Sequence, residues 1–500
     1  MPLRICFVTA EMTPFAKAGG LADVSGALVK YLHADGHDIR LFMPAYASIS
    51  RSGLEIYPVD FLQNMWVQLG SHRFDFSVLT ARLPGSDTFV YLVDCPAVFH
   101  RGSIYTTSGD EHLRFLVLTH AAFICCQYMG FAPQIMHFND WHTAAGTLLR
   151  RATYGWDGLF ADTRTVLTIH NIGYQGDIGA HAADEVLPGG PHALLNAGGL
   201  NHGHINLLRT GLAYADLITT VSPTYAKEIQ TAAYGMGLED LLRARGSSVT
   251  GILNGVDYDE WDPRRDRFLP QHYGANQLGV KAELKQEFLQ RMRLSSGTRT
   301  ALIGLVTRFA TQKGLDLLIG ALPPLLHARE FILVALGTGE RRYEDFFSNL
   351  QRRFPARVHF HRGYSDQMAH WIEAASDMFL MPSHYEPCGL NQMYSLRYGT
   401  VPIVRRTGGL ADSVQHFDRA TGQGTGVVFN DYDVAGVSWA VHTALDLYRE
   451  KALWRRLVQN AMAQDFSWNL QVRHYVDAYE SLLPAPAALP AAAAAAAPGV

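Results

Sequence analysis

Two cations and a carboxylate follow predicted strands in the second half of the chain. Arg308 and Lys313 lie just past an apolar run at 302–306, and Glu386 follows a run that ends at Met381. Fixed positive charge would stabilise the diphosphate that leaves when a sugar–phosphate bond breaks. A carboxylate could face the positive charge that develops on the sugar. Cations at a helix start oppose the helix dipole, which favours a functional role for them, whereas Glu386 could also belong to an ordinary turn.

Two glycine loops also follow predicted strands. Lys17, Gly19 and Gly20 lie between the first strand and the first helix, and Thr407 and Gly408 begin a second such loop. Glycines let a ligand approach the backbone, and the free N–H groups of a helix start attract anions. Lys17 adds a point charge. The pattern is not G-x-G-x-x-G, which argues against a standard NAD site, and each loop alone could be a tight turn.

Histidine and aspartate residues supply further candidates. His170 and Asp140 each follow a strand-like run, where such side chains are structural as often as functional. An H-x-H pattern at 202–204 could suggest a metal, but the sequence offers no third ligand at a sensible spacing. The D-x-D patterns at 257–259 and 431–433 occur in turn-rich contexts, and we interpret both as turns. We therefore predict no metal site and no cofactor.

These candidates need strands that end beside loops, and the apolar pattern supplies such strands. Short apolar runs alternate with segments of helical spacing, which predicts an α/β fold with parallel sheets covered by helices on both faces. The expected strands are 5–8, 39–43, 134–138, 166–169, 217–221, 302–306, 331–336, 358–361, 378–381 and 401–404. Ligands bind at the C-terminal ends of such strands, so we expect the site in a cleft between two domains.

The domain boundaries follow from where this pattern stops and restarts. A polar, charged stretch near 250–300 separates two series of strands and helices. We predict a first domain at 1–252, a second at 253–460, and a helix at 461–483 that crosses back to the first domain. The last segment, 484–500, is almost entirely Ala and Pro without charge, and we predict that it is a disordered tail.

The composition indicates a soluble globular protein. Hydrophobic residues make up 48% and charged residues 18% of the chain, and the formal net charge is -4, which argues against nucleic acid as the main partner. Five cysteines without C-x-x-C favour a reducing compartment over a disulfide framework. The apolar run at the N-terminus is too short for a signal peptide, and the longest one, 115–131, is interrupted by polar residues. We therefore expect a cytoplasmic protein that does not associate with membranes.

Taken together, the motifs resemble those of bacterial and plant glycogen and starch synthases over residues 5–483. The matching segments are K-A-G-G-L from Lys17, H-N-I-G-Y-Q-G from His170, N-G-V-D from Asn254, T-Q-K-G-L-D from Thr311, P-S-H-Y-E-P-C-G-L-N-Q from Pro382, R-R-T-G-G-L-A-D-S-V from Arg405 and D-F-S-W from Asp465. Their order and spacing extend the resemblance over all of the chain except its alanine-rich end.

The resemblance implies a GT-B arrangement, in which two Rossmann-like domains face each other across a cleft. It also implies ADP-glucose as the donor, an α-1,4-glucan such as glycogen as the acceptor, transfer with retention of configuration, and no required metal. By matching position, the implied catalytic residues are Glu386, His170, Arg308 and Lys313. The implied substrate-binding residues are Lys17, Gly19, Gly20, Asp23, Asp140, Asn254, Tyr364, Cys388, Gly389, Leu390, Thr407 and Gly408.

Two positions bear on the alternatives. His384 stands where many relatives have Arg, and Tyr394 stands eight residues after Glu386, where many other retaining glycosyltransferases carry a second glutamate. Tyr394 and the K-x-G-G-L motif argue against another GT-B enzyme that uses UDP-glucose, such as a sucrose- or trehalose-type synthase. A glucan-binding or regulatory protein without catalysis is the other alternative. The joint presence of Lys17, Arg308, Lys313 and Glu386 argues against it.

Overall fold

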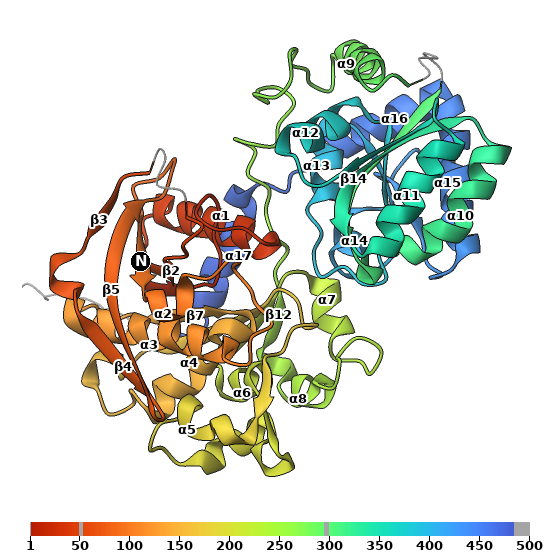
Figure 1. Ribbon diagram of the computed structural model, residues 1–500. Helices are drawn as coiled ribbons and strands as arrows, with labels where there is room; N and C mark the ends of the chain where they lie inside the picture. Colours follow the sequence, from red (N-terminus) through yellow and green to blue (C-terminus); the bar gives the residue numbers. More distant parts are fainter. Residues whose placement is uncertain (1, 50–53, 295–299, 485–500) are drawn as a thin grey trace, which may run out of the picture.

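The computed structural model describes residues 2–49, 54–294 and 300–484, so the predicted tail, apart from its first residue, lies outside the described residues. Figure 1 shows two lobes that meet where α7 (Pro223–Glu228) lies beside α14 (Gly408–Ser413). The first lobe contains strands β1 to β12, and the second contains strands β13 to β18. The site residues expected from the sequence lie on both lobes.

The first lobe is built on a mostly parallel sheet. Its strands are β1 (Arg4–Val8), β2 (Asp38–Pro44), β3 (Ile56–Pro58), β4 (Met65–Leu69), β5 (His72–Arg82), β6 (Phe89–Asp94), β7 (Ile135–Asn139), β8 (Arg164–Ile169), β11 (Leu217–Thr220) and β12 (Val249–Gly251). Their order is β12-β11-β8-β7-β1-β2-β6-β5-β3, with β4 also paired to β5. All the pairs from β12 to β6 are parallel, whereas β5 pairs antiparallel with each of its neighbours. The parallel part contains the five strands predicted for this lobe together with β6 and β12, which were not predicted, and the antiparallel outer strands extend it.

Helices pack on this sheet and on one another. They are α1 (Gly20–Ala34), α2 (Pro96–Phe99), α3 (Glu111–Met129), α4 (Asp140–Ala152), α5 (Ala183–Val186), α6 (Leu207–Tyr214), α7 and α8 (Glu239–Ala244), and β9 (Asp177–Gly179) and β10 (His204–Asn206) form a separate two-stranded antiparallel sheet. Strand β1 is buried except at Arg4, as a continuous apolar run requires when both faces of a sheet are covered. The apolar stretch at 115–131 lies in the buried helix α3 up to Met129, and Gly130 follows the helix in the left-handed region.

The second lobe is a fully parallel sheet with the order β15-β14-β13-β16-β17-β18. Its strands are β13 (Ala301–Phe309), β14 (Phe331–Gly339), β15 (Val358–Arg362), β16 (Met378–Met381), β17 (Val401–Arg405) and β18 (Val427–Phe429). Its helices are α9 (Leu278–Arg291), α10 (Leu315–Ala328), α11 (Arg341–Arg353), α12 (Asp366–Ala375), α13 (Asn391–Tyr398), α14, α15 (Val434–Arg449) and α16 (Lys451–Met462). Strand β13 is longer than the predicted run at 302–306 because Arg308 and Phe309 continue the pairing with β14.

The chain passes between the lobes twice, and the two connections run side by side. The N–H of Val256 donates to the carbonyl of Phe466 at 2.7 Å, and Val256 also forms a parallel bridge with Ser467. After the second connection, α17 (Trp468–Glu480) packs against α1 of the first lobe, as Figure 1 shows. The hydroxyl of Tyr479 lies 2.7 Å from His137 Nδ1, which anchors this helix in the core of the first lobe.

Candidate active site

The structure brings Lys313 and Glu386 into direct contact. Lys313 Nζ lies 2.8 and 2.7 Å from the two carboxylate oxygens of Glu386, and the hydroxyl of Ser383 donates to one of them at 2.9 Å. The Glu386 side chain is 5% exposed and that of Lys313 is 19% exposed. Gly314 is required beside this pair, because its φ is +69° and a Cβ there would lie 1.9 Å from the carbonyl oxygen of Pro382. Two loops separated by 73 residues are thus fixed against each other.

Arg308 lies within β13 and not beyond it, which corrects the expectation from the sequence. The strand continues because Arg308 pairs with Thr338 of β14. The Arg308 side chain is exposed. Burial raises the pKa of the Tyr385 phenol, and the positive charge of Arg308 nearby acts in the opposite direction. Arg308 therefore lies near the segment that carries Glu386. Because its guanidinium is exposed, it is accessible to a ligand.

The first glycine loop does bind a carboxylate, and that carboxylate belongs to Glu11. The N–H groups of Ala18 and Gly19 donate to the same Glu11 oxygen at 2.5 and 2.9 Å, and the hydroxyl of Tyr105 donates to the other at 2.7 Å. A Cβ on Gly20 would meet no atom within 4 Å, so the space above the loop is open. Sequence reasoning missed Glu11, although an acidic residue three positions after a buried strand and before a glycine loop was the available signal.

Lys17 faces both its own helix and the second lobe. Its Nζ lies 2.8 Å from Asp23 of α1. Although burial disfavours the ammonium charge, Asp23 raises the pKa of Lys17 above its ordinary value, and Tyr364 and Glu260 add to this effect. Tyr364 is exposed and belongs to the second lobe. Residues from both lobes therefore approach each other around Lys17.

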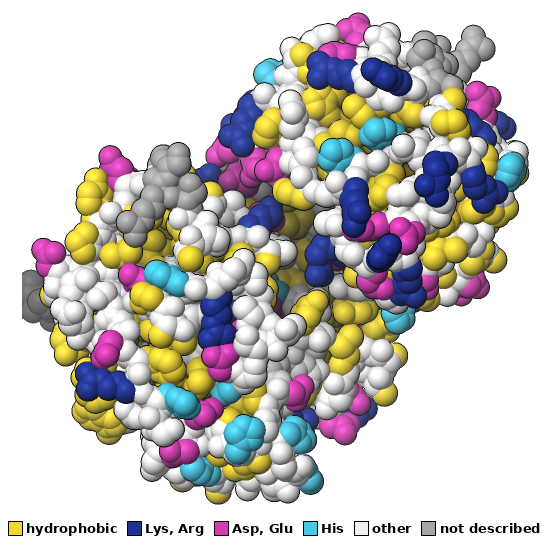
Figure 2. Space-filling view, in the orientation of Figure 1, with side chains coloured by type: hydrophobic (Ala, Val, Ile, Leu, Met, Phe, Trp, Pro, Cys, Tyr) yellow, Lys and Arg dark blue, Asp and Glu magenta, His cyan; other side chains and the backbone are white. Residues whose placement is uncertain are grey.

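A cavity of about 420 Å³ extends from this point between the lobes. Figure 2 shows the surface hollowed there, with Lys and Arg side chains along the hollow. Asp23 and Lys30 line the cavity from α1, and Leu390 and Tyr394 line it from the second lobe. The ring of Trp261, which also lines it, stacks on Tyr394 with a centroid distance of 3.9 Å. Tyr394, eight residues after Glu386, thus contributes a packed ring and no charge to this cavity.

Asp140 lies below the His170 loop in the first lobe. One of its oxygens accepts from the N–H of His170 at 2.7 Å and from that of Asn171 at 3.2 Å. Asp140 has a φ of +54°, a conformation that aspartate adopts more readily than most residues. Burial raises the pKa of Asp140 to about 7, although the two N–H bonds act in the opposite direction. Its carboxylate is therefore poised between charged and neutral forms near neutral pH.

His170 is held in one orientation by Asn139. The amide nitrogen of Asn139 donates to the carbonyl of Val8 at 3.0 Å, so its oxygen faces His170 Nε2 at 2.9 Å. Nε2 must then carry the proton, which leaves Nδ1 as an acceptor. Burial lowers the pKa of His170 to about 3. The imidazole is therefore neutral at neutral pH.

The second glycine loop is engaged by Glu228 of the first lobe. The hydroxyl of Thr407 donates to Glu228 at 3.0 Å, and the N–H of Gly408 lies 3.1 Å from each carboxylate oxygen. The polar groups of two predicted substrate-binding residues thus contact a side chain of the chain itself. Cys388 is buried next to Asn254, and burial raises the pKa of its thiol to about 12.

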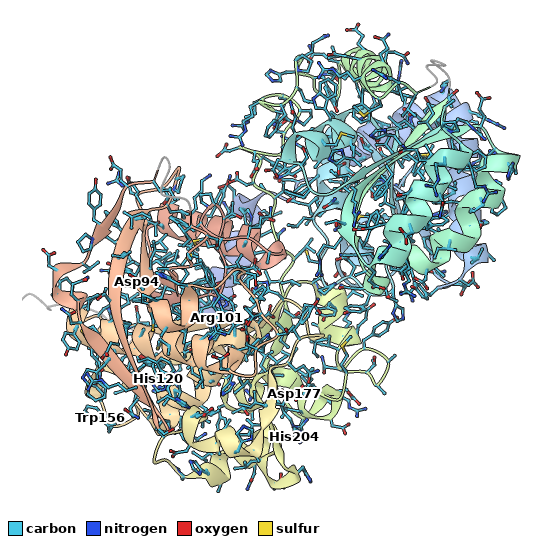
Figure 3. All side chains as sticks on the ribbon, in the orientation of Figure 1. Asp94, Arg101, His120, Trp156, Asp177 and His204 are labelled. Carbon is cyan, nitrogen blue, oxygen red and sulfur yellow. The ribbon has the colours of Figure 1, made fainter. Side chains whose placement is uncertain are left out.

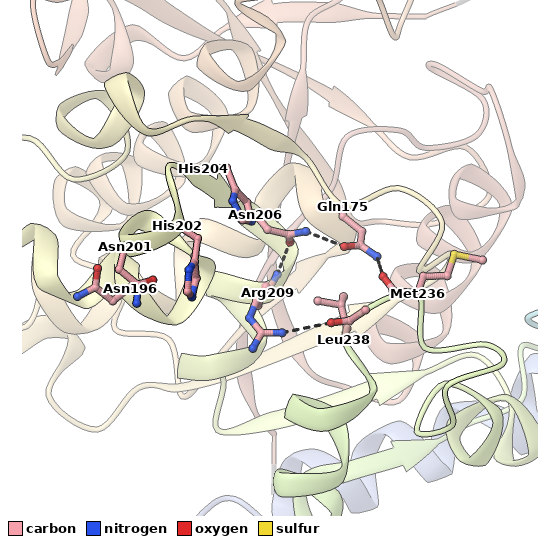
Figure 4. Close-up of a pocket in the computed structure, with 11 residues that line it drawn as sticks. Gln175, Asn196, Asn201, His202, His204, Asn206, Arg209, Met236 and Leu238 are labelled. Atoms are coloured by element: carbon pink, nitrogen blue, oxygen red, sulfur yellow. Dashed lines mark hydrogen bonds between the residues drawn. The ribbon is translucent and has the colours of Figure 1, made fainter.

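The second cavity lies behind the His170 loop, has a volume of about 370 Å³, and is drawn in Figure 4. The side-chain nitrogen of Gln175 donates to the carbonyls of Ile172 and Met236 at 3.2 and 3.1 Å. Asn206 donates to the Gln175 oxygen at 2.6 Å and fixes its orientation. This network holds the end of the His170 loop in place.

The H-x-H pattern that could have suggested a metal lines a cavity, and aspartates of the two D-x-D patterns have other partners. His202 and His204 line the second cavity, and Figure 3 shows His204 at the end of the first lobe away from the second. Asp257 and Asp259 both pair with Lys30, at 3.1 and 3.3 Å. Asp433 accepts from the N–H of Gly436 at 2.7 Å and caps α15. Within the described part of the chain, no group of three or more His, Cys, Asp or Glu side chains is arranged to hold a metal ion.

Comparisons with known proteins identify the family. Residues 4–244 match the starch synthase catalytic domain, and residues 288–463 match the glycosyl transferases group 1. The glycogen synthase of Koribacter versatilis is 42% identical over 485 residues, which cover 96% of this chain and 98% of the relative. The chain belongs to the glycogen and starch synthase family. A further member, the glycogen synthase of Thermotoga maritima, is 40% identical over 489 residues, with 96% and 99% of the two chains covered.

Solved structures agree with membership of this family. The catalytic domain of starch synthase IV from Arabidopsis thaliana, bound to ADP and acarbose, superposes with a TM-score of 0.89 at 31% identity and covers 96% of this chain and 99% of its own. Sucrose-phosphate synthase from Thermosynechococcus elongatus has a TM-score of 0.60 at 14% identity over 96% and 99% of the chains, which indicates a shared fold alone. The predicted GT-B fold and the prediction of a hexosyltransferase are confirmed. Of the helices in the described residues, none has the length and apolar character needed to cross a membrane.

Proposed function

We propose that this enzyme transfers glucose from ADP-glucose to the non-reducing end of an α-1,4-glucan, with retention of configuration and release of ADP. The relatives named glycogen synthase support this choice, as does the starch synthase neighbour bound to ADP and acarbose. The observation that carries the proposal is the contact between Lys313 and Glu386. It joins a cation suited to a phosphate with a carboxylate suited to a reacting sugar.

The donor diphosphate would lie between cations of both lobes. Lys17 approaches from the first lobe, and Arg308 and Lys313 approach from the second. Such preorganised positive charge acts most strongly when the sugar–phosphate bond breaks, because the leaving ADP then gains negative charge. Gly389 and Leu390, directly before α13, would present backbone N–H groups to the same phosphates, which is the usual role of a helix start.

Glu386 would stabilise the positive charge on the anomeric carbon and ring oxygen of glucose. In the structure Lys313 neutralises this buried carboxylate. A donor phosphate would compete for Lys313 and leave more of the Glu386 charge facing the sugar. The hydroxyl of Ser383 would keep the carboxylate in place during this exchange. This interaction would be stronger in the transition state than in the bound donor, as catalysis requires.

The acceptor side would be formed by Asp140 and His170. Because His170 is neutral with Nδ1 unprotonated, it can accept a hydrogen bond from a sugar hydroxyl. Asp140 accepts a hydrogen bond from the backbone N–H of His170 and so helps to fix the position of the imidazole and its Nδ1. Tyr364, exposed next to Lys17, would offer a ring to the base of the nucleotide.

The test is a side-by-side rate of glucose incorporation into a glycogen primer from ADP-glucose and UDP-glucose. We expect the faster rate with ADP-glucose. A faster rate with UDP-glucose would identify UDP-glucose as the donor and support the alternative of another GT-B enzyme. Absence of incorporation from both would support a glucan-binding protein without catalysis.

The role of Glu386 is tested by Glu386→Gln, with Glu373→Gln as the matched control. Glu373 is a buried glutamate of the same lobe, and burial raises its pKa to about 8, so an amide changes little there. We expect Glu386→Gln to lower kcat by about a hundredfold or more, with little change in ADP affinity, because the charge acts in the transition state. Near-normal turnover of this variant would remove Glu386 from the reaction.

A further inference from the structure

The contact between α7 and α14 is built from two carboxylates that each hold the start of the opposite helix. Glu228 of α7 accepts from the hydroxyl of Thr407 and the N–H of Gly408. Asp412 of α14 accepts from the N–H and the hydroxyl of Thr224, at 2.8 and 2.6 Å. The two contacts have the same chemistry and cross the same junction between the lobes. They differ in what lies next to them.

The Glu228 contact lies directly behind Glu386. The N–H of Gly409 donates to the backbone carbonyl of Glu386 at 3.1 Å. A Cβ on Gly408 would lie 1.9 Å from that same carbonyl oxygen, and one on Gly409 would lie 2.2 Å from the carbonyl oxygen of Cys388. The start of α14 and the Glu386 segment are therefore packed backbone to backbone. A displacement of Gly408 must move Glu386.

The first lobe also contacts the Glu386 segment from the same side. The hydroxyl of Ser222, next to α7, donates to the carbonyl of Pro387 at 2.6 Å. The buried core of the first lobe continues into Cys388 and Leu410 of the second. The backbone that carries Glu386 is thus positioned by side chains of the opposite lobe as well as by β16.

We infer that Glu228 is a positioning residue for glucosyl transfer: by holding Thr407 and Gly408 across the lobe junction, its carboxylate sets the position of Glu386 relative to the donor. This inference rests on the proposed role of Glu386. Glu228 does not touch the reacting atoms and acts through the start of α14. Asp412 also links the two lobes. Its partner is Thr224 of the first lobe, however, and not a residue of the second lobe next to Glu386.

The experiment compares Glu228→Ala with the matched control Asp412→Ala. Both remove one carboxylate from the same junction, so both should lower Tm to a similar extent. We expect Glu228→Ala to lower kcat by about ten- to a hundredfold, the effect of a small misplacement of a reacting group, with the KM for ADP-glucose within about twofold of the wild type. Asp412→Ala should change kcat by less than about twofold. Equal losses of kcat in the two variants, or a loss that appears in KM alone, would overturn the inference.

Two further variants keep the test decisive. Glu228→Gln retains one acceptor oxygen for Thr407 or Gly408, so it should recover part of the lost kcat, and it serves in place of the alanine variant if that variant fails to fold. In the Glu386→Gln background, Glu228→Ala should lower the residual turnover little further, because residues that act as a unit are not additive. A full additional loss there would show that Glu228 does not act through Glu386. Absence of glucosyl transfer by the wild type would instead refute the proposed function, so the two failures are distinct.

Discussion

Replacing Lys313 by alanine should destabilise the second lobe strongly in the wild type and weakly when Glu386 is already glutamine. The single change leaves a carboxylate that is 5% exposed without its cation. In the Glu386→Gln background the same change removes a contact to a neutral amide. The difference between the two effects measures the energetic coupling of the pair.

The magnitude follows from the burial of the two partners. Removing one partner of a buried ion pair typically costs about 3–5 kcal/mol. Because the Lys313 side chain is 19% exposed and Ser383 still donates to the carboxylate, we expect about 2–3 kcal/mol in the wild type. The loss of a bond to a neutral amide should cost about 1 kcal/mol. For a lobe of roughly 200 residues these values correspond to Tm decreases of about 4–12 °C and about 2–4 °C.

The assay is thermal unfolding of the four proteins, namely wild type, the two single variants and the double variant, at pH 7.5 and at lower pH. Without Lys313 the buried carboxylate of Glu386 would carry an uncompensated charge, which protonation removes. The stability penalty of Lys313→Ala is therefore expected at neutral pH and should diminish in acid. Equal Tm decreases in both backgrounds at pH 7.5 would refute the reasoning, because the two charges would then not interact.

Two further outcomes are expected. Lys17→Ala should raise the KM for ADP-glucose about tenfold or more, because a charge-assisted hydrogen bond to the donor is lost; initial rates measure this, and an unchanged KM would remove Lys17 from the donor site. Burial raises the folded pKa of Asp140 to about 7, from an unfolded value of about 3.9, so the wild type loses stability as the pH rises from 5 to 7. The Asp140→Asn variant has no such group to titrate. Its stability relative to the wild type should therefore increase by up to about 1.4 kcal/mol per pH unit. Tm values at several pH values measure this difference, and a constant difference would contradict it.

Most of the buried parallel strands could be predicted from the sequence because their signal is local, whereas β6 and the short β18 were not predicted. The run at Ile5–Val8 and its counterparts in the second lobe carry apolar side chains on both faces. This pattern is typical of a parallel strand that helices cover on both sides of the sheet. Strand β4 escaped prediction, although Met65–Leu69 alternates buried and exposed residues, a pattern typical of a strand with one solvated face. Arg308 was placed outside its strand because the polar end of β13 carries no apolar signal.

The side chains that complete the site were harder to predict because their partners are distant in sequence. The motifs indicated that Lys313 and Glu386 both belong to the site, but the sequence holds no sign that they touch across 73 residues. Glu228 meets Gly408 across 180 residues, and nothing around Glu228 in the sequence marks it as a cross-lobe contact. Tertiary packing decides such pairs, and a single sequence contains no direct record of it.

The paired connections between the lobes limit how the enzyme can open and close. Val256 and Phe466 share a backbone hydrogen bond, so the two crossing segments move as one ribbon. A ribbon of this kind resists sliding and separation but permits rotation about its own axis. A change in the relative placement of the lobes would then be described largely by one angle. A single distance between a probe on each lobe should therefore report any such rotation.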